Sequence, residues 1–337
     1  MIIQKQWFML AAVAADGMTN KPTATTFSST TRINMRLNKN TLHTVLLALM
    51  LGVFASSPVR AGEPVTLMHV HGLSYSADGK QLLIPSHHGL AVFENGRWSK
   101  AAGPAHDYMG YSATRDALYS SGHPAPDSGL TSPFGLIKSR DGGKTWQQLG
   151  LTGESDFHTL ATSYATNAVY VLNHLPNSRM SQAGIYYTLN DGLKWTRAAA
   201  KGLGPKLNSL AVHPTDAALV AAGADDGLYL SRNSAESFER LAGGKQVLAA
   251  SFDLDGQHLW FSTHAGKAAL VRIALKAGAK AEEVPLPALT KDAVAYIAQN
   301  PVRRSEIAIA TFTRHVFLSK DQGRSWTQIA KDGKTRE

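Results

Sequence analysis

Histidine is the side chain in this sequence with the clearest capacity for chemistry, since twelve of the 13 histidines follow residue 61. Several of them lie in three short polar segments, Met68-His-Val-His71, His106-Asp-Tyr-Met109 and Glu154-Ser-Asp-Phe-His158. Imidazoles bind zinc, copper, nickel or iron, and thioethers next to imidazoles favour copper. No compact motif such as His-Glu-x-x-His occurs, so a shared site requires the fold to bring distant segments together.

A repeated eight-residue pattern indicates which elements position these segments. Two segments, Ser139-Arg-Asp-Gly-Gly-Lys-Thr-Trp146 and Ser319-Lys-Asp-Gln-Gly-Arg-Ser-Trp326, share Ser-x-Asp-x-Gly-x-Thr/Ser-Trp, and residues 188–195 and 231–238 are looser copies. The hydroxyl and carboxylate can accept hydrogen bonds from the turn's own amides, the glycine supplies positive φ, and the tryptophan packs between layers. The pattern predicts a hairpin turn with structural roles for Ser139, Asp141, Gly143, Trp146, Asp191, Trp195, Ser319, Asp321, Gly323 and Trp326.

These segments resemble Asp-boxes, and the chain after residue 61 resembles the BNR/Asp-box β-propellers. That group includes sialidase-like glycosyl hydrolases, sortilin-type receptors and photosystem assembly factors. The resemblance implies a propeller architecture for the whole of this part. It says little about activity, because the box is a structural turn found in proteins of unrelated function.

The spacing of the repeats predicts the number of blades. Centres at residues 95, 141, 191, 233 and 321 are 46, 50, 42 and 88 residues apart, and the last interval equals two steps of 44. Units of this size are usual for four-stranded blades. We expect an all-β fold, a six-bladed β-propeller, with blades near residues 65–101, 102–150, 151–200, 201–243, 244–288 and 289–331.

The antiparallel order of strands within a blade predicts that most histidines share one face of the ring. The box turn and the first hairpin loop of each blade lie on one face, and the starts of the innermost strands and the second hairpin loops lie on the other. Ten of the twelve histidines map to this second face. We expect a metal site for copper or zinc near the channel mouth, formed by His69, His71, His106, His123, His158 and Met109, with Asp107 and Asp156 close by.

Two other functions remain open. A glycosidase could use paired carboxylates from Asp107, Glu154 and Asp156 with Tyr108 beside them, acting on a carbohydrate ligand. A true sialidase is not expected, because the arginine triad and the Arg-Ile-Pro segment of the resembled family are missing. The third alternative is a receptor or assembly propeller that presents its loops to a protein partner, so whether the chain is an enzyme stays undecided.

The N-terminal part predicts export. The formal charge is +9, but the first 61 residues carry six basic side chains and one acidic one, so residues 62–337 carry only +4. These charges are scattered, and a nucleic-acid partner is not expected. Residues 35–61 have the basic, apolar and small-residue regions of a signal peptide, and residues 1–34 read as a non-structural extension. We expect residues 62–337 to form one periplasmic or secreted domain that is monomeric and has no permanent membrane anchor. The sequence contains no cysteine.

Overall fold

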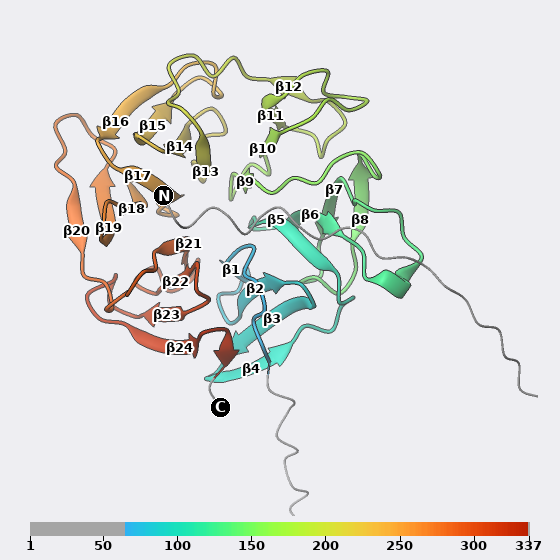
Figure 1. The fold of residues 1–337 in the computed structure, drawn as a ribbon, viewed down its shortest axis with the longest axis horizontal. Coiled ribbons are helices and arrows are strands. Elements are labelled where there is room, and N and C mark those ends of the chain that lie inside the picture. The colour runs from blue at the N-terminus through green and yellow to red at the C-terminus, as the bar shows by residue number, and fades with distance from the viewer. Residues whose placement is uncertain (1–64, 336–337) are drawn as a thin grey trace, which may run out of the picture. The chain divides into compact units, whose positions relative to one another are not determined.

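The computed structural model describes residues 65–335, and within them the fold is a six-bladed β-propeller with 25 strands and one short 3-10 helix, η1 (Pro126–Ser128). Six antiparallel sheets are arranged around a central axis, and the first strand of each sheet lies nearest that axis (Figure 1). The predicted blades agree with the observed sheets. The predicted signal peptide and extension lie outside the described residues.

The strands of each blade follow one another in chain order from the centre outwards. Blade 1 contains β1 (Ser74–Tyr75), β2 (Leu82–Ser86), β3 (Gly89–Glu94) and β4 (Arg97–Lys100). Blade 2 contains β5 (Asp107–Ala113), β6 (Leu118–His123), β7 (Leu136–Ser139) and β8 (Gln147–Gly150). Blade 3 contains β9 (Leu160–Thr162), β10 (Val169–Asn173), β11 (Gly184–Thr188) and β12 (Thr196–Arg197).

The second half of the ring repeats this order. Blade 4 contains β13 (Leu207–Val212), β14 (Val220–Ala224), β15 (Gly227–Ser231) and β16 (Glu239–Gly243). Blade 5 contains β17 (Gln246–Phe252), β18 (His258–His264), β19 (Ala268–Ala274) and β20 (Glu282–Val284). Blade 6 contains β21 (Val294–Gln299), β22 (Ile307–Thr311), β23 (Val316–Ser319), β24 (Thr327–Lys331) and a fifth strand, β25 (Lys334–Thr335), which lies beyond the predicted end of the last blade.

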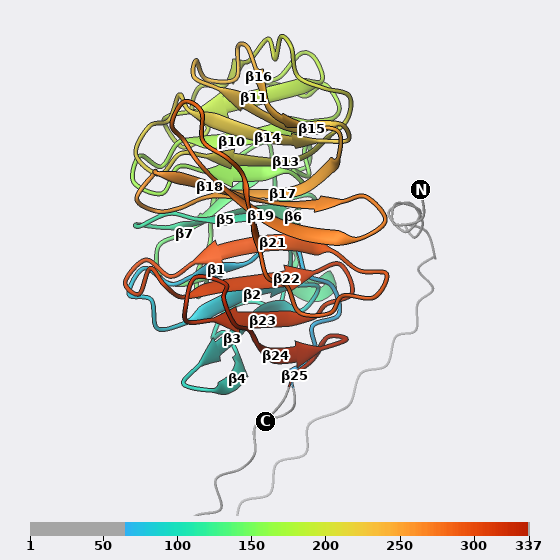
Figure 2. The ribbon, with the colours of Figure 1, turned by 90° about the vertical axis from the view of Figure 1, so that its left-hand side faces the viewer.

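The two ends of the described chain meet and close the ring. Thr66 forms an isolated bridge with Lys334, and the Leu67 amide donates to the Gly333 carbonyl at 2.7 Å. The Trp98 indole of β4 donates to the Ile329 carbonyl of β24 at 3.1 Å, and both views show β4 beside β24 (Figures 1 and 2). Blades 1 and 6 are therefore joined by hydrogen bonds as well as by packing.

The repeated turns are held by their own polar side chains. Ser139 Oγ accepts from the Gly143 amide at 2.8 Å and donates to Asp141 Oδ1 at 2.8 Å, and Asp141 Oδ1 accepts from the Thr145 amide at 2.9 Å. The turn that begins at Ser319 repeats these contacts. A Cβ on Gly143 would lie 2.4 Å from Leu90 of the preceding blade, so glycine permits close packing between blades there.

Asp191 was predicted to be a box residue, and this assignment is wrong. The third turn places Asn190 at the aspartate position, where its Oδ1 accepts from the Lys194 amide at 2.9 Å. Asp191, one residue later, instead binds the buried Lys138 Nζ at 2.8 Å and accepts from Tyr119 OH at 2.6 Å. This copy matches the pattern poorly, so the sequence alone did not show that the aspartate position is occupied by Asn190 and not by Asp191. Asp191 instead forms an ionic contact between blades 2 and 3.

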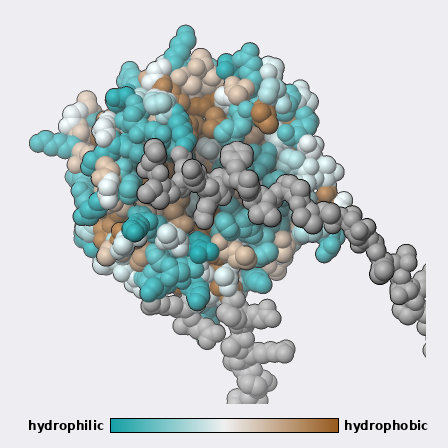
Figure 3. Space-filling model, viewed as in Figure 1, coloured by the Kyte–Doolittle hydropathy of each residue, from teal (hydrophilic) through white to brown (hydrophobic). Residues whose placement is uncertain are grey.

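The hydrophobic core lies between neighbouring blades. Between blades 1 and 2, for example, Leu83 and Val92 pack with Tyr108 and Ile137. On the side of the molecule seen in Figure 3, hydrophilic residues predominate, and apolar residues lie in small groups. Among residues 65–335, no helix has the length and apolar character needed to cross a membrane.

Candidate metal centre

Three backbone segments bring histidines together beside the first strand of blade 2. His69 and His71 lie just before β1, where the His71 amide donates to the Pro85 carbonyl of β2 at 3.2 Å. His87 lies in the tight turn between β2 and β3. The Gly89 amide at the end of that turn donates to the His106 carbonyl at 2.9 Å, which holds the turn against the start of β5. Gly89 has a φ of +93°, and a Cβ there would lie 3.3 Å from Ala105 Cα. A glycine at this position therefore allows the turn to lie close to the backbone before β5.

The imidazoles of His69, His71 and His87 converge. One ring nitrogen from each lies within 4.8 Å of the other two. The rings of His69 and His71 are nearly parallel, with centroids 6.0 Å apart, and His87 meets both edge-on at 4.3 and 5.1 Å. His71 is buried, His87 is half-buried and His69 is exposed, so the group is open to solvent on one side. Three imidazoles with an open position suit zinc or copper.

Asp107, the first residue of β5, orients this group. Its Oδ2 lies 2.7 Å from His87 Nδ1, and its Oδ1 lies 3.7 Å from His71 Nε2. A carboxylate at Nδ1 favours the tautomer in which that nitrogen carries the proton, which leaves the Nε2 lone pair available as a ligand. The carboxylate therefore stands in the position of an outer-shell partner.

The electrostatic surroundings keep two of these imidazoles neutral. Burial is the largest cause that lowers the pKa of His71 to about 3, and the neighbouring His87, His69 and His158 lower it further. Burial, followed by His87 and Arg314, also lowers the pKa of His69. A neutral imidazole has a lone pair to donate, so both side chains are suited to bind a cation at neutral pH.

A second cluster joins blades 2 and 3. His123 Nε2 lies 3.2 Å and His158 Nε2 lies 2.6 Å from the same Asp156 oxygen, Oδ2. His123 Nδ1 also lies 2.9 Å from Ser132 Oγ. Burial alone would raise the pKa of Asp156, but the hydrogen bonds and charges of the two imidazoles hold it well below its usual range. The hydrogen bond to Asp156 is the largest cause that raises the pKa of His123.

The two clusters are neighbours in the sheet. Asp107 and His123 are directly opposite each other in the antiparallel pair β5–β6, so their side chains project from the same side of the blade. His158 and Asp156 also influence the pKa of His71. The structure thus brings together four of the five histidines that we predicted to converge, in two adjacent groups rather than in one.

His106 does not join either cluster. Its Nδ1 accepts a hydrogen bond from the Ala125 amide at 3.0 Å, and its ring packs edge-on against Phe134 at 4.9 Å. Burial lowers its pKa. Met109 is buried two residues after Asp107. His106 is therefore better explained by packing than by ligation.

Two of the predicted catalytic residues have structural contacts. Tyr108 is fully buried, donates to the Pro104 carbonyl at 3.0 Å and packs on Trp146 at 4.7 Å. Burial raises its pKa, which disfavours a role in proton transfer. Glu154 is exposed and accepts from the Ser178 amide at 2.7 Å and hydroxyl at 2.9 Å, so it fixes the loop after β10.

His87 is the residue that sequence reasoning omitted from the site. The topology placed it on the histidine-rich face, but its distance in sequence from the inner strands gave no reason to join it to His69 and His71. The sequence feature that could have identified His87 is the pair His87-His88, because a two-residue turn between strands projects its side chains from the end of the blade.

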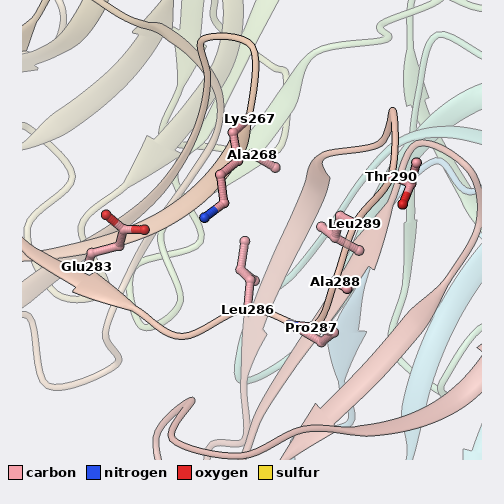
Figure 4. Close-up of a pocket in the computed structure, with 8 residues that line it drawn as sticks. All are labelled: Lys267, Ala268, Glu283, Leu286, Pro287, Ala288, Leu289 and Thr290. Carbon is pink, nitrogen blue, oxygen red and sulfur yellow. The ribbon is translucent and has the colours of Figure 1, made fainter.

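Two further features lie elsewhere. Asp253, Asp255 and His258 of blade 5 also bring ligand atoms within 4.8 Å, but Arg272 already lies 2.7 Å from Asp253 Oδ2 and 3.0 Å from His258 Nδ1. A pocket of about 390 Å³ lies at the connection between blades 5 and 6, lined by Leu286 and Leu289 with Lys267 and Glu283 (Figure 4). No histidine lines it.

Comparison with known proteins supports the fold and no more. No protein-family model matches the chain, and no curated protein matches it in sequence. Among solved structures, the GH74 enzyme of Niastella koreensis aligns with a TM-score of 0.53 and 14% identity over 79% of this chain and 46% of that one. The chain therefore spans less than half the length of that enzyme.

Two further solved structures show the same architecture. The nidogen/laminin complex aligns with a TM-score of 0.52 and 11% identity over 71% of this chain and 88% of that one. Hydrazine synthase of Kuenenia stuttgartiensis aligns with a TM-score of 0.50 and 13% identity over 79% and 80%. At this identity the similarity defines the chain as a β-propeller and leaves its activity to be argued from the site.

Proposed function

We propose that this chain is an exported β-propeller of the BNR/Asp-box type that binds a transition-metal ion, copper or zinc, through His69, His71 and His87. The observation that carries the proposal is the convergence of three imidazoles within 4.8 Å, one of them oriented by Asp107 at 2.7 Å. A histidine that binds a metal usually donates its second ring N–H to a carboxylate, a backbone carbonyl or water, and Asp107 supplies such a partner here.

The site chemistry favours metal binding over glycoside hydrolysis. A glycosidase needs carboxyl groups that are free to exchange a proton with substrate or to attack it. Here Asp107 contacts His87, Asp156 contacts His123 and His158, and Glu154 contacts Ser178. Each carboxylate is thus engaged by a neighbouring side chain, as expected where carboxylates orient imidazoles.

The export and assembly state are part of the same proposal. Residues 35–61 would direct the chain to the periplasm or the outside of the cell, where it would act as a monomer. The turns at Ser139 and Ser319 have the internal hydrogen bonds expected of Asp-boxes, which supports the family assignment. They lie on the face opposite the histidines and would take no part in binding.

Metal titration of matched variants tests the proposal. The full chain, purified without a histidine tag, should bind Zn²⁺ or Cu²⁺ at pH 7.5, and His69→Ala combined with His87→Ala should remove one equivalent. His71 is left in place because it is buried. His174→Ala is the control, since His174 is exposed in a loop on the same face and should leave the stoichiometry unchanged. Unchanged metal content in the double variant would overturn the proposed function.

A further inference from the structure

A hydroxyl, an imidazole and a carboxylate lie in line at the end of β6. Ser132 Oγ lies 2.9 Å from His123 Nδ1, and His123 Nε2 lies 3.2 Å from Asp156 Oδ2. Nucleophile, base and orienting acid follow one another in this order in serine hydrolases, whose triads occur on unrelated folds. The two ring nitrogens exchange roles relative to the usual triad, which leaves the path of the proton from hydroxyl to imidazole intact.

The exposure of these side chains decreases from the hydroxyl to the carboxylate. Ser132 is exposed, the His123 side chain is 46% exposed and the Asp156 side chain is 18% exposed. The hydroxyl is thus accessible to a substrate, while the carboxylate is shielded from solvent. A nucleophile and the groups that activate it require this arrangement.

The charge of Asp156 sets the tautomer of His123. Burial opposes ionisation of the carboxyl group, but the hydrogen bonds from His123 and His158 hold the pKa of Asp156 well below its usual range. An ionised carboxylate at Nε2 keeps the imidazole proton on that nitrogen and leaves Nδ1 free to accept the proton of Ser132. The same hydrogen bond is the largest cause that raises the pKa of His123, which makes the imidazole a stronger base.

The loop that carries Ser132 is anchored where it returns to the blade. This loop joins β6 to β7. The Phe134 amide donates to the Gly122 carbonyl at 2.8 Å, and the Gly153 amide donates to the Pro133 carbonyl at 2.7 Å. The residues that follow Ser132 are therefore held by the backbone of blade 2 and of the segment that leads to blade 3, which limits the reorganisation needed for catalysis.

We propose that Ser132, His123 and Asp156 form a second functional site, which hydrolyses small carboxylic esters through an acyl-enzyme. Ser132 Oγ attacks the carbonyl carbon while its proton passes to His123 Nδ1. The bond from the carbonyl carbon to the alcohol oxygen then breaks, and the leaving alcohol takes that proton. Water attacks the acyl carbon next, its proton passes through Nδ1 to Ser132 Oγ, and the carboxylic acid leaves. Ser132 and His123 are the catalytic residues, and Asp156 is a positioning residue.

This activity goes beyond the proposed function and requires no metal ion. Because Ser132 is exposed in a surface loop, the substrate class that fits is an unhindered ester with a good leaving group. His123 is the direct cross-strand partner of Asp107, so the two sites share one end of blade 2. A metal-bound hydroxide also cleaves esters, and the experiment must therefore separate the two sites.

Labelling of the full-length, untagged protein with a fluorophosphonate tests the nucleophile. An activated serine displaces fluoride from phosphorus and retains the phosphonyl group, which tandem mass spectrometry locates. We expect the label at Ser132. Labelling should slow by about 100-fold or more in His123→Gln, because a general base typically contributes a factor of about 10²–10⁴. Ser128→Ala is the matched control, since Ser128 is an exposed serine of the same loop and its loss should leave labelling unchanged.

Hydrolysis of p-nitrophenyl acetate in the presence of a chelator separates this site from the metal site. The unmodified protein and His69→Ala with His87→Ala should be equally active, whereas Ser132→Ala should show only the background rate. Asp156→Asn should lower kcat by about 100-fold with KM unchanged, because an amide N–H at Nε2 favours the tautomer whose Nδ1 carries the proton and cannot accept another. Melting curves should be alike for Ser132→Ala and the unmodified protein, since Ser132 is exposed.

The outcomes distinguish the two proposals. Absence of label at Ser132, or hydrolysis that survives Ser132→Ala, would overturn the ester-cleaving site. Hydrolysis that survives Ser132→Ala and disappears with the chelator would assign the activity to a metal-bound hydroxide, which supports the proposed function instead. Label at Ser132 in a protein that binds no zinc would support the ester-cleaving site and overturn the proposed function.

Discussion

Two groups of acidic and imidazole side chains in this propeller each bring three ligand atoms together, but their surroundings differ. One is His69, His71 and His87 with Asp107, and the other is Asp253, Asp255 and His258 of blade 5. The loops that carry them lie on opposite faces of the ring, because β17 enters blade 5 from the histidine-rich face and ends at Phe252, just before Asp253. In both groups three ligand atoms lie within 4.8 Å of one another.

The two groups differ in which positive charge balances their carboxylates. Asp253 is almost fully buried and accepts from Trp260 Nε1 at 2.5 Å and from Arg272 at 2.7 Å. The guanidinium occupies the place where a metal ion would contribute positive charge. No lysine or arginine contacts the His87 and Asp107 pair among the described residues. Closely spaced ligand atoms therefore indicate a metal site only where no neighbouring arginine or lysine already balances the charge of the carboxylates.

The largest expected effect is on stability, at Asp253. Replacing Asp253 with Ala should lower the free energy of unfolding by about 3–5 kcal/mol, because it leaves Arg272 partly buried without its counter-charge. Asp255→Ala is the matched control, since Asp255 is exposed and should change stability by less than about 0.5 kcal/mol. Urea unfolding measures both. Equal stability of the two variants would contradict the structural role of Asp253, and metal stoichiometry should be unaffected by either.

The next effect is the pH dependence of stability in the metal-free protein, and it depends on His71. Its folded-state pKa is lowered to about 3 by burial, whereas the unfolded chain titrates near 6.5. At pH values between about 3 and 6.5, the unfolded chain binds a proton at His71 and the folded protein does not. The free energy of unfolding therefore falls as the pH falls. From pH 6.5 to pH 5 the loss due to His71 should be about 1.6 kcal/mol, because the slope rises from about half of 1.36 kcal/mol per pH unit at pH 6.5 to nearly the full value at pH 5.

His71→Gln isolates this contribution. Urea unfolding at pH 7 and pH 5 should show a smaller loss for the variant than for the unmodified protein. His123 contributes in the opposite sense, because its raised pKa stabilises the fold at low pH and this stabilisation is lost as the pH rises through that pKa. The comparison of the two proteins cancels His123, which both retain. Parallel curves would show that His71 accepts a proton in the folded state.

The sequence was sufficient to predict the ring and its faces, because turn chemistry repeats at blade length. Ser139, Asp141 and Gly143 form a self-contained turn, so their pattern carries its own structure. Asn190 occupies the aspartate position of its turn and accepts the hydrogen bond with its amide oxygen, so a pattern that requires aspartate does not detect it. Trp146 and Trp326 pack against neighbouring core clusters, as expected of tryptophans that lie between layers, but each is only partly buried.

The side-chain partners within the site could not be predicted in the same way. His106 and His87 lie on the same face, yet the Ala125 amide engages the first and Asp107 orients the second. Those contacts depend on loop paths and rotamers, which have no period in the sequence. Topology therefore predicts which residues can meet on a face, and the three-dimensional contacts decide which of them share a site.

The last expected effect distinguishes an orienting carboxylate from a stabilising one. Asp107→Asn keeps the side-chain volume but removes the charge that fixes the His87 tautomer, and loss of such outer-shell partners typically weakens metal binding about 10–100-fold. The number of ions bound should not change. Asp253→Asn is the control, since it should leave zinc affinity unaltered while reducing stability. Competition with a chelator of known affinity measures both variants at pH 7.5. If Asp107→Asn binds zinc as tightly as the unmodified protein, His87 does not depend on Asp107 for its orientation; if Asp253→Asn weakens binding equally, the contrast between the two groups fails.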